Sequence, residues 1–174
     1  MKSVLIAIRP QWCEKIASGQ KTIEVRKTAP QEVPFKAYIY CTKEKKQDDI
    51  IWAGIFGDRG KWNGRVIGEF ICNNASELDY VYYWNNGYEF ATCLTYRQVA
   101  DYGKGKPLYG WHISDLKIYD KPKELSEFCI PCKVSCENCK NPLYFECWCE
   151  EKGKKIVTRP PQSWCYVEDL GEEK

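Results

Sequence analysis

Three ionisable side chains, Lys21, Glu24 and Arg26, lie within six residues near the start of this 174-residue chain. The stretch reads G-x-K-x-x-E-x-R and begins at Gly19, a residue type that often ends a helix. On a strand, Glu24 and Arg26 would share one face because they are two residues apart. Charged side chains are rarely buried without a partner, so the pattern predicts a polar site on that face.

These residue types suit the recognition of a phosphate or a nucleic-acid base. A Lys beside a carboxylate can bind phosphate, or can act as a general base if it is desolvated. Arg26 can hold a phosphate or a base edge through two parallel hydrogen bonds, and Glu24 can orient Arg26 or accept from a base amino group. The alternative is a structural ion pair, which contributes only about 0–1 kcal/mol when it is exposed.

A second group with possible chemistry is six cysteines within 21 residues, Cys129-x2-Cys132, Cys136-x2-Cys139 and Cys147-x-Cys149. Paired C-x2-C motifs are typical of zinc knuckles, in which thiolates surround Zn²⁺ tetrahedrally. Only three residues separate the two pairs. We therefore expect the ligands to be Cys132, Cys136, Cys139 and Cys147, with Cys129 and Cys149 as further candidates. Free thiols without a metal are the alternative.

A zinc ion here would be structural, because a segment of about 50 residues buries too little core to fold alone. It would also hold the segment Arg159–Val167 against the barrel, which would bring Arg159 and Gln162 near the charged cluster. The spacing Cys132-x3-Cys136-x2-Cys139 also matches an iron–sulfur motif of radical enzymes, but that motif belongs to a large α/β barrel that this chain lacks.

The elements expected to position these residues are short strands and helices. The apolar run Val4–Arg9 predicts a strand, and Pro10 begins a helix that Gly19 ends. Further strands are expected at 21–27, 35–42, 65–72 and 108–119, and Thr95 caps a short helix at 96–102. We interpret 43–64 as a long loop or hairpin and 73–87 as turns. The fold class is therefore α+β and mainly β, a mostly antiparallel β-barrel with two or more short helices.

Composition narrows the class of protein. Hydrophobic content of 44% and charged content of 29% indicate a globular chain. The net charge is only +2, so nothing demands nucleic acid. A local basic patch and a solvated loop explain Lys36, Lys43, Lys45 and Lys46 equally well.

No apolar run approaches the roughly 18–20 residues of a membrane span, and the run at 4–8 is too short for the core of a signal peptide. We therefore expect a cytoplasmic protein that makes no membrane contact. In that compartment, eleven cysteines indicate metal ligands or free thiols rather than disulfides.

The order of strand, helix and then Gly19-x-Lys21-x-x-Glu24-x-Arg26 resembles the ASCH family of PUA-like barrels. The segment 66–70, which reads VIGEF, is similar to that family's second common segment, and 109–116 is similar to its final strand. The resemblance covers residues 1–120, which implies a PUA-like barrel domain there. Residues 121–174 would then form a Cys-rich, zinc-binding extension that packs back on the barrel. The ending at 159–168 is similar to that of ASCH-like proteins carried by bacteria and phages.

The resemblance implies a cleft, lined by Lys21, Glu24 and Arg26, that binds RNA. Some family members are enzymes: one branch hydrolyses the acetyl amide of N4-acetylcytidine with a Thr nucleophile at the position of Glu24, and another is reported to be a ribonuclease. Because a Glu stands at that position here, we expect binding of RNA or of a modified nucleotide rather than that amide hydrolysis.

Four further side chains are expected to line the same cleft as ligand-binding residues, namely Tyr40, Thr42, Trp111 and His112. Aromatic rings there could stack a base, as in many sites for single-stranded RNA. Core packing is the alternative, both for Trp111 and for the other aromatic residues of this chain.

Two other function classes stay open. If the protein is an enzyme, we expect a hydrolase of a nucleoside amide or of an RNA phosphodiester, with Lys21 as base and Glu24 or Glu69 as acid and base. The third class is an interaction protein of phages or mobile elements that uses the Cys-rich extension as its docking surface.

Overall fold

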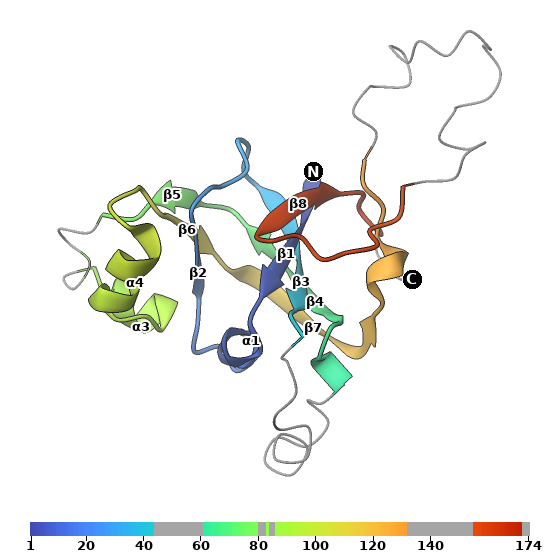
Figure 1. Ribbon diagram of the computed structural model, residues 1–174, viewed down its shortest axis with the longest axis horizontal. Helices are drawn as coiled ribbons and strands as arrows, with labels where there is room; N and C mark the ends of the chain where they lie inside the picture. Colours follow the sequence, from blue (N-terminus) through green and yellow to red (C-terminus); the bar gives the residue numbers. More distant parts are fainter. Residues whose placement is uncertain (44–60, 80–82, 84–85, 132–154, 172–174) are drawn as a thin grey trace, which may run out of the picture.

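The computed structural model describes residues 1–43, 61–79, 83, 86–131 and 155–171 (Figure 1). Within them, the larger of two sheets has five strands in the order β7-β4-β3-β1-β8. Their bounds are Ser114–Lys123 (β7), Val66–Cys72 (β4), Phe35–Cys41 (β3), Lys2–Ile8 (β1) and Trp164–Val167 (β8). Strands β1 and β3 run parallel, and every other neighbouring pair in this sheet is antiparallel.

The smaller sheet is antiparallel, with β2 (Ile23–Arg26), β6 (Tyr109–His112) and β5 (Ala75–Glu77) in the order β2-β6-β5. Helix α1 (Pro10–Ala17) follows β1, while α3 (Tyr88–Thr92) and α4 (Tyr96–Gly103) lie together beside the smaller sheet (Figure 1). A 3-10 helix, η2 (Leu125–Glu127), follows β7. The predicted α+β, mainly β class is therefore confirmed. No helix in the described ranges has the length and apolar character to cross a bilayer.

Strand β1 is buried on both faces, which explains why its sequence is a continuous apolar run. Its even-numbered residues from position 4 onward pack with α1 in one core cluster. Leu5 and Ala7 point the other way, into a second cluster that includes Phe128 and Val157. Pro10, at the first position of α1, and Gly19, with a φ of 75°, then fix where the helix begins and where the chain turns away. The end of β1 is thus held rigidly where the candidate site lies.

Strand β8 brings the segment after the Cys-rich stretch back to the larger sheet, where it forms the edge strand next to β1. It pairs antiparallel with β1, from Ser3 opposite Val167 to Ile6 opposite Trp164. At the other end of this segment, the Ile130 amide donates to the Lys155 carbonyl over 2.8 Å, and Cys129 bridges Ile156. The described residues that flank the stretch 132–154 on its two sides therefore lie side by side. The division of the chain at residue 120 stays a prediction.

Several elements differ from those expected. The strand predicted at 108–119 is two strands, β6 and β7, because the Ile113 amide donates to the Thr22 carbonyl while the residues that follow pair with β4. Residues 75–77 form β5 rather than a turn, because their backbone pairs with β6. Helix α3 and strand β8 were not expected at all. All of these differences arise from pairing or packing between residues far apart in the sequence.

Asp169 fixes the chain beyond β8. Its Oδ1 accepts hydrogen bonds from the Tyr38 hydroxyl at 2.6 Å and from Lys36 Nζ at 3.0 Å, both on β3. The Leu170 amide in turn donates to the Tyr38 hydroxyl over 3.0 Å. Burial alone would raise the pKa of Asp169, but the hydrogen bonds from Tyr38 and Lys36 outweigh it and lower the pKa below its usual value. The end of the described chain is thus tied to β3 by a carboxylate.

Asp169→Asn should lower the free energy of unfolding at neutral pH by about 1 kcal/mol, because a neutral amide accepts more weakly than a carboxylate. Since the folded-state pKa is lowered, this stabilisation is present above the unfolded pKa of about 3.9 and is lost as the pH falls through the folded value. The difference between wild type and variant should therefore shrink in acid. Urea denaturation at neutral and acid pH measures it.

Asp101→Asn is the control for this experiment, because the Asp101 carboxylate lies in an exposed ion pair 4.0 Å from Arg97 and should contribute little. An Asp169→Asn difference that stays the same at every pH would contradict the role given to the carboxylate.

Candidate functional site

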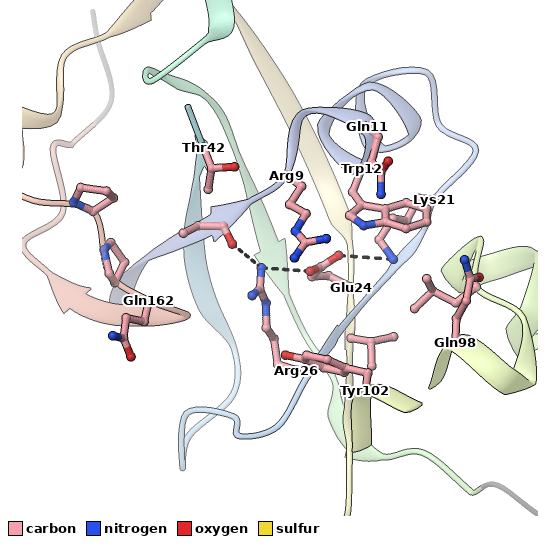
Figure 2. Close-up of a pocket in the computed structure, with 15 residues that line it drawn as sticks. Arg9, Gln11, Trp12, Lys21, Glu24, Arg26, Thr42, Gln98, Tyr102 and Gln162 are labelled. Carbon is pink, nitrogen blue, oxygen red and sulfur yellow. Dashed lines mark hydrogen bonds and ion pairs between the residues drawn. The ribbon is translucent and has the colours of Figure 1, made fainter. Parts of the chain in front are cut away.

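A cavity of about 490 Å³ lies where the end of β1, α1, β2 and α4 meet the segment before β8 (Figure 2). Its polar lining residues are Arg9, Gln11, Lys21, Glu24, Arg26, Thr42, Gln98 and Gln162. The volume falls within the roughly 300–1,000 Å³ of sites that bind small molecules. Three lining side chains are cationic and one is a carboxylate, so the cavity carries a net charge of +2. We call this cavity the cleft.

Lys21, Glu24 and Arg26 form one ion-pair cluster at the cleft, which we call the Glu24 cluster (Figure 2). Glu24 Oε2 lies 3.3 Å from Lys21 Nζ, and Glu24 Oε1 lies 3.0 Å from Arg26 Nη2. Each cation also donates to a backbone carbonyl, Lys21 to that of Thr92 at 2.7 Å and Arg26 to that of Ala7 at 2.6 Å. Exposed fractions of 2%, 6% and 8% for the three residues make this a buried cluster.

The cluster depends on the position of β2. This strand pairs with β6, with Glu24 opposite Trp111 and Arg26 opposite Tyr109. Because side chains alternate along a strand, Glu24 and Arg26 share the face that meets β1 and α1. Lys21 precedes the strand, and its amide donates to the Lys15 carbonyl of α1 over 2.9 Å. Strand β2 and the turn before it therefore bring Lys21, Glu24 and Arg26 into contact.

Two aromatic side chains line the cleft, Trp12 from α1 and Tyr102 from α4 (Figure 2). Lys21 Nζ lies 5.4 Å from the centroid of the Trp12 ring, and Lys27 Nζ lies 4.9 Å from that of Tyr102. Cations over aromatic faces hold the rings in place. The cleft therefore combines fixed planar surfaces with charged and amide groups.

The residues that the sequence nominated for the cleft are only partly brought together. Lys21, Glu24, Arg26 and Thr42 line it. Tyr40 is 3% exposed and packs into the second core cluster, where burial raises its pKa. Trp111 is fully buried, with its ring 5.0 Å from that of Phe35 and 5.7 Å from that of Trp164. Tyr40 and Trp111 are not among the lining residues.

His112 and Glu69 also lie away from the cleft lining. His112 is on β6 opposite Ile23, and burial lowers its pKa, which favours the neutral imidazole. Glu69 on β4 accepts a hydrogen bond from the Tyr119 hydroxyl at 2.6 Å and lies 4.0 Å from Lys36 Nζ. Glu69 thus belongs to a different polar group from Glu24.

The predicted metal ligands Cys132, Cys136, Cys139, Cys147 and Cys149 lie outside the described residues. Cys129 is described and is half-buried, with its backbone bridged to Ile156. Zinc binding stays a prediction.

Sequence reasoning missed several residues that line the cleft, above all Arg9, Trp12 and Tyr102. Trp12 falls within the helix predicted after Pro10, and Tyr102 is the last residue of the helix predicted at 96–102. Gln162 does line the cleft, whereas Arg159 is not among the lining residues. The signal available in the sequence was the position of Arg9. It is the charged residue that ends the apolar run of β1, directly before Pro10 begins α1.

Comparison with solved structures matches the ASCH protein of Zymomonas mobilis and two of its point mutants, each with a TM-score of 0.58. The identities are 18%, 19% and 19%, over 96% or 97% of this chain and 88% to 91% of the matched chains. At that identity the likeness concerns the fold, and the predicted ASCH resemblance is confirmed at that level. No protein-family profile matches the sequence, and no curated protein does.

Glu24→Gln should lower the free energy of unfolding by about 3–5 kcal/mol, because it leaves two buried cations without their shared carboxylate. Chemical denaturation of the purified variant measures the loss. Glu77→Gln removes an exposed carboxylate on β5 and should stay within about 0.5 kcal/mol of wild type. A Glu24→Gln protein as stable as the Glu77→Gln protein would show that the cluster does not support the fold.

Proposed function

We propose that this chain, which has the fold of the ASCH-domain proteins, is a PUA-like module that binds RNA or a modified nucleotide in the cleft. The observation that carries the proposal is the Glu24 cluster, a buried carboxylate between two cations, at a cavity with aromatic walls and a net charge of +2. Such a cavity favours an anionic, planar ligand. Nucleotides combine both properties.

The side chains around the cluster suit the parts of a nucleotide. Indole and phenol rings such as those of Trp12 and Tyr102 stack on bases of any sequence. Amide groups, supplied here by Gln11, Gln98 and Gln162, can both donate to and accept from base edges. The resemblance to RNA-binding PUA-like modules supports the same conclusion.

A hydrolase is the second candidate, supported by a Lys and a Glu only 3.3 Å apart at a cavity. Such a pair can exchange a proton with a bound substrate. However, both side chains are already engaged within the protein: the Lys21 ammonium donates to the Thr92 carbonyl at 2.7 Å, and Glu24 also lies 3.0 Å from Arg26 Nη2. Binding without turnover is therefore the better-supported activity. A role as an interaction protein of phages or mobile elements stays a prediction.

Trp12→Leu should weaken binding of a short single-stranded RNA of mixed sequence about tenfold, because a base loses its stacking partner. Affinity of the wild type should fall as salt rises, since phosphates release counterions on binding. Fluorescence anisotropy over a salt series measures both effects. Replacing Trp12 tests binding more directly than replacing Arg26, because loss of Arg26 also breaks an ion pair of the buried Glu24 cluster.

Phe90→Leu is the matched control for Trp12→Leu, because Phe90 is 83% exposed and lies outside the cleft lining. Equal RNA binding by Trp12→Leu and wild type would contradict the proposal. The recovered RNA, and N4-acetylcytidine incubated in parallel, are also analysed for products. Turnover that Lys21→Met abolishes would favour the hydrolase.

We also propose a structural Zn²⁺ held by four of the cysteines at 129–149. Support comes from the described ends of that region, where Ile130 and Lys155 are joined by a 2.8 Å hydrogen bond. A stretch whose ends meet can close on a metal without displacing the sheets. Residues Phe128 and Val157, just outside the junction, pack into the second core cluster.

Elemental analysis of the purified protein should find about one zinc per chain, and a chelator that removes it should lower the melting temperature. Cys136→Ser should lose the metal, whereas Cys93→Ser, at a half-buried thiol directly after α3, should keep it. Protein that contains no zinc after preparation in zinc-supplemented medium would reject the site.

A further inference from the structure

Arg9 is the cation of the cleft that has no ion-pair or hydrogen-bond partner for its guanidinium among the described residues. The other two cations are engaged, since Lys21 and Arg26 share Glu24 and each also donates to a backbone carbonyl. Arg9 is exposed, lines the cleft, and points into it between Thr42 and Trp12 (Figure 2). Its charge is thus available to a ligand at no cost to the fold.

The backbone around Arg9 fixes where that charge lies. Arg9 caps the N-terminus of α1 in an extended conformation, with a φ of −69° and a ψ of 146°, and Pro10 follows at the first helical position. The Arg9 carbonyl accepts from the amides of Trp12 and Cys13, at 2.9 and 3.1 Å. The start of α1 adds its partial positive charge to the same rim of the cleft. The guanidinium therefore projects from a fixed point rather than from a loose loop.

The cleft as a whole has more hydrogen-bond donors than acceptors. Glu24 is its sole carboxylate among the lining residues, and both of its oxygens already face cations. Arg26 Nε is buried and has no hydrogen-bond partner within the described part of the chain. A ligand that balances this excess must bring oxygen acceptors and negative charge. A neutral nucleoside brings oxygen acceptors but no negative charge.

From this charge balance we infer that Arg9 binds the phosphate of a nucleotide, so that the cleft selects the phosphorylated form over the nucleoside. The inference rests on the proposed nucleotide-binding function. It adds that the phosphate is the group recognised and that Arg9 is the residue that binds it. A guanidinium matches two phosphate oxygens with parallel hydrogen bonds. The Thr42 hydroxyl lies on the same side of the cleft as Arg9 (Figure 2).

This placement leaves the rest of the cleft for the sugar and the base. Trp12 is three residues beyond Arg9 and lines the same cavity, so a phosphate at Arg9 sets the base beside the indole ring. Gln98 and Tyr102 line the cavity from α4, across from Arg9 (Figure 2). Arg9 is then the residue that determines specificity for the phosphate, and the aromatic rings hold the base whether or not a phosphate is present.

The test compares the four ribonucleoside 5′-monophosphates with their nucleosides by isothermal titration of wild type, Arg9→Gln and Arg97→Gln. Wild type should bind at least one nucleotide about tenfold or more tightly than the matching nucleoside, as expected for charge-assisted hydrogen bonds. Arg9→Gln should reduce that ratio to about twofold. Arg97→Gln removes a guanidinium that is 91% exposed and outside the cleft lining, and should keep the wild-type ratio.

The outcomes separate this inference from the proposed function. A wild type that binds nucleoside and nucleotide equally, or an Arg9→Gln protein that keeps the full preference, overturns the role of Arg9 while nucleotide binding stands. Protein that binds RNA but none of the mononucleotides also overturns the inference. If wild type binds neither RNA nor any nucleoside or nucleotide, the proposed function fails and the inference fails with it.

Discussion

The cleft depends on the ion pairs that the carboxylate of Glu24 makes with Lys21 and Arg26. This carboxylate lies between two cations that are themselves almost completely buried, and its removal would leave both without compensation. The cations also reach the carbonyls of Ala7 and Thr92, so the same cluster joins β2 to β1 and to the end of α3. This buried carboxylate thus links three elements of the fold, and the same cluster lines the cleft. The contacts that support the fold therefore also shape the cleft.

The two sheets meet the cleft in different ways. The larger sheet contributes the rigid end of β1, which is fixed because both of its faces are buried. The smaller sheet contributes β2, whose register against β6 sets which side chains face the cleft. The helices contribute the aromatic rings, Trp12 from α1 and Tyr102 from α4. Two of the charged residues, Glu24 and Arg26, thus lie on a strand whose pairing fixes their direction, whereas the two aromatic rings lie on helices.

Local patterns in the sequence were enough to predict β1, α1 and the Glu24 cluster. These features depend only on nearby residues: an apolar run, a proline, a glycine, and three charged residues spaced three and two positions apart. All of them lie within about twenty residues. The same reasoning failed for β8 and β5, whose short sequences become strands only because a distant partner pairs with them. It also left open whether Trp111 lines the cleft or packs in the core, because a strand pattern shows alternation but not which face lies in the core. Arg9 could not be identified from the sequence either. It stands out only in the structure, where Lys21 and Arg26 are paired with Glu24 and Arg9 is not.

The last wall of the cleft comes from residues 160–162, immediately before β8. During synthesis, the strand that carries Glu24 and Arg26 leaves the ribosome long before this segment does, and a domain generally folds as a unit. The edge of β1 must then wait, unpaired, for a strand that is made near the end of the described chain. A nascent chain that has reached β7 still lacks one wall of the cleft. The cleft is therefore complete only once residues 160–162 and β8 have been made.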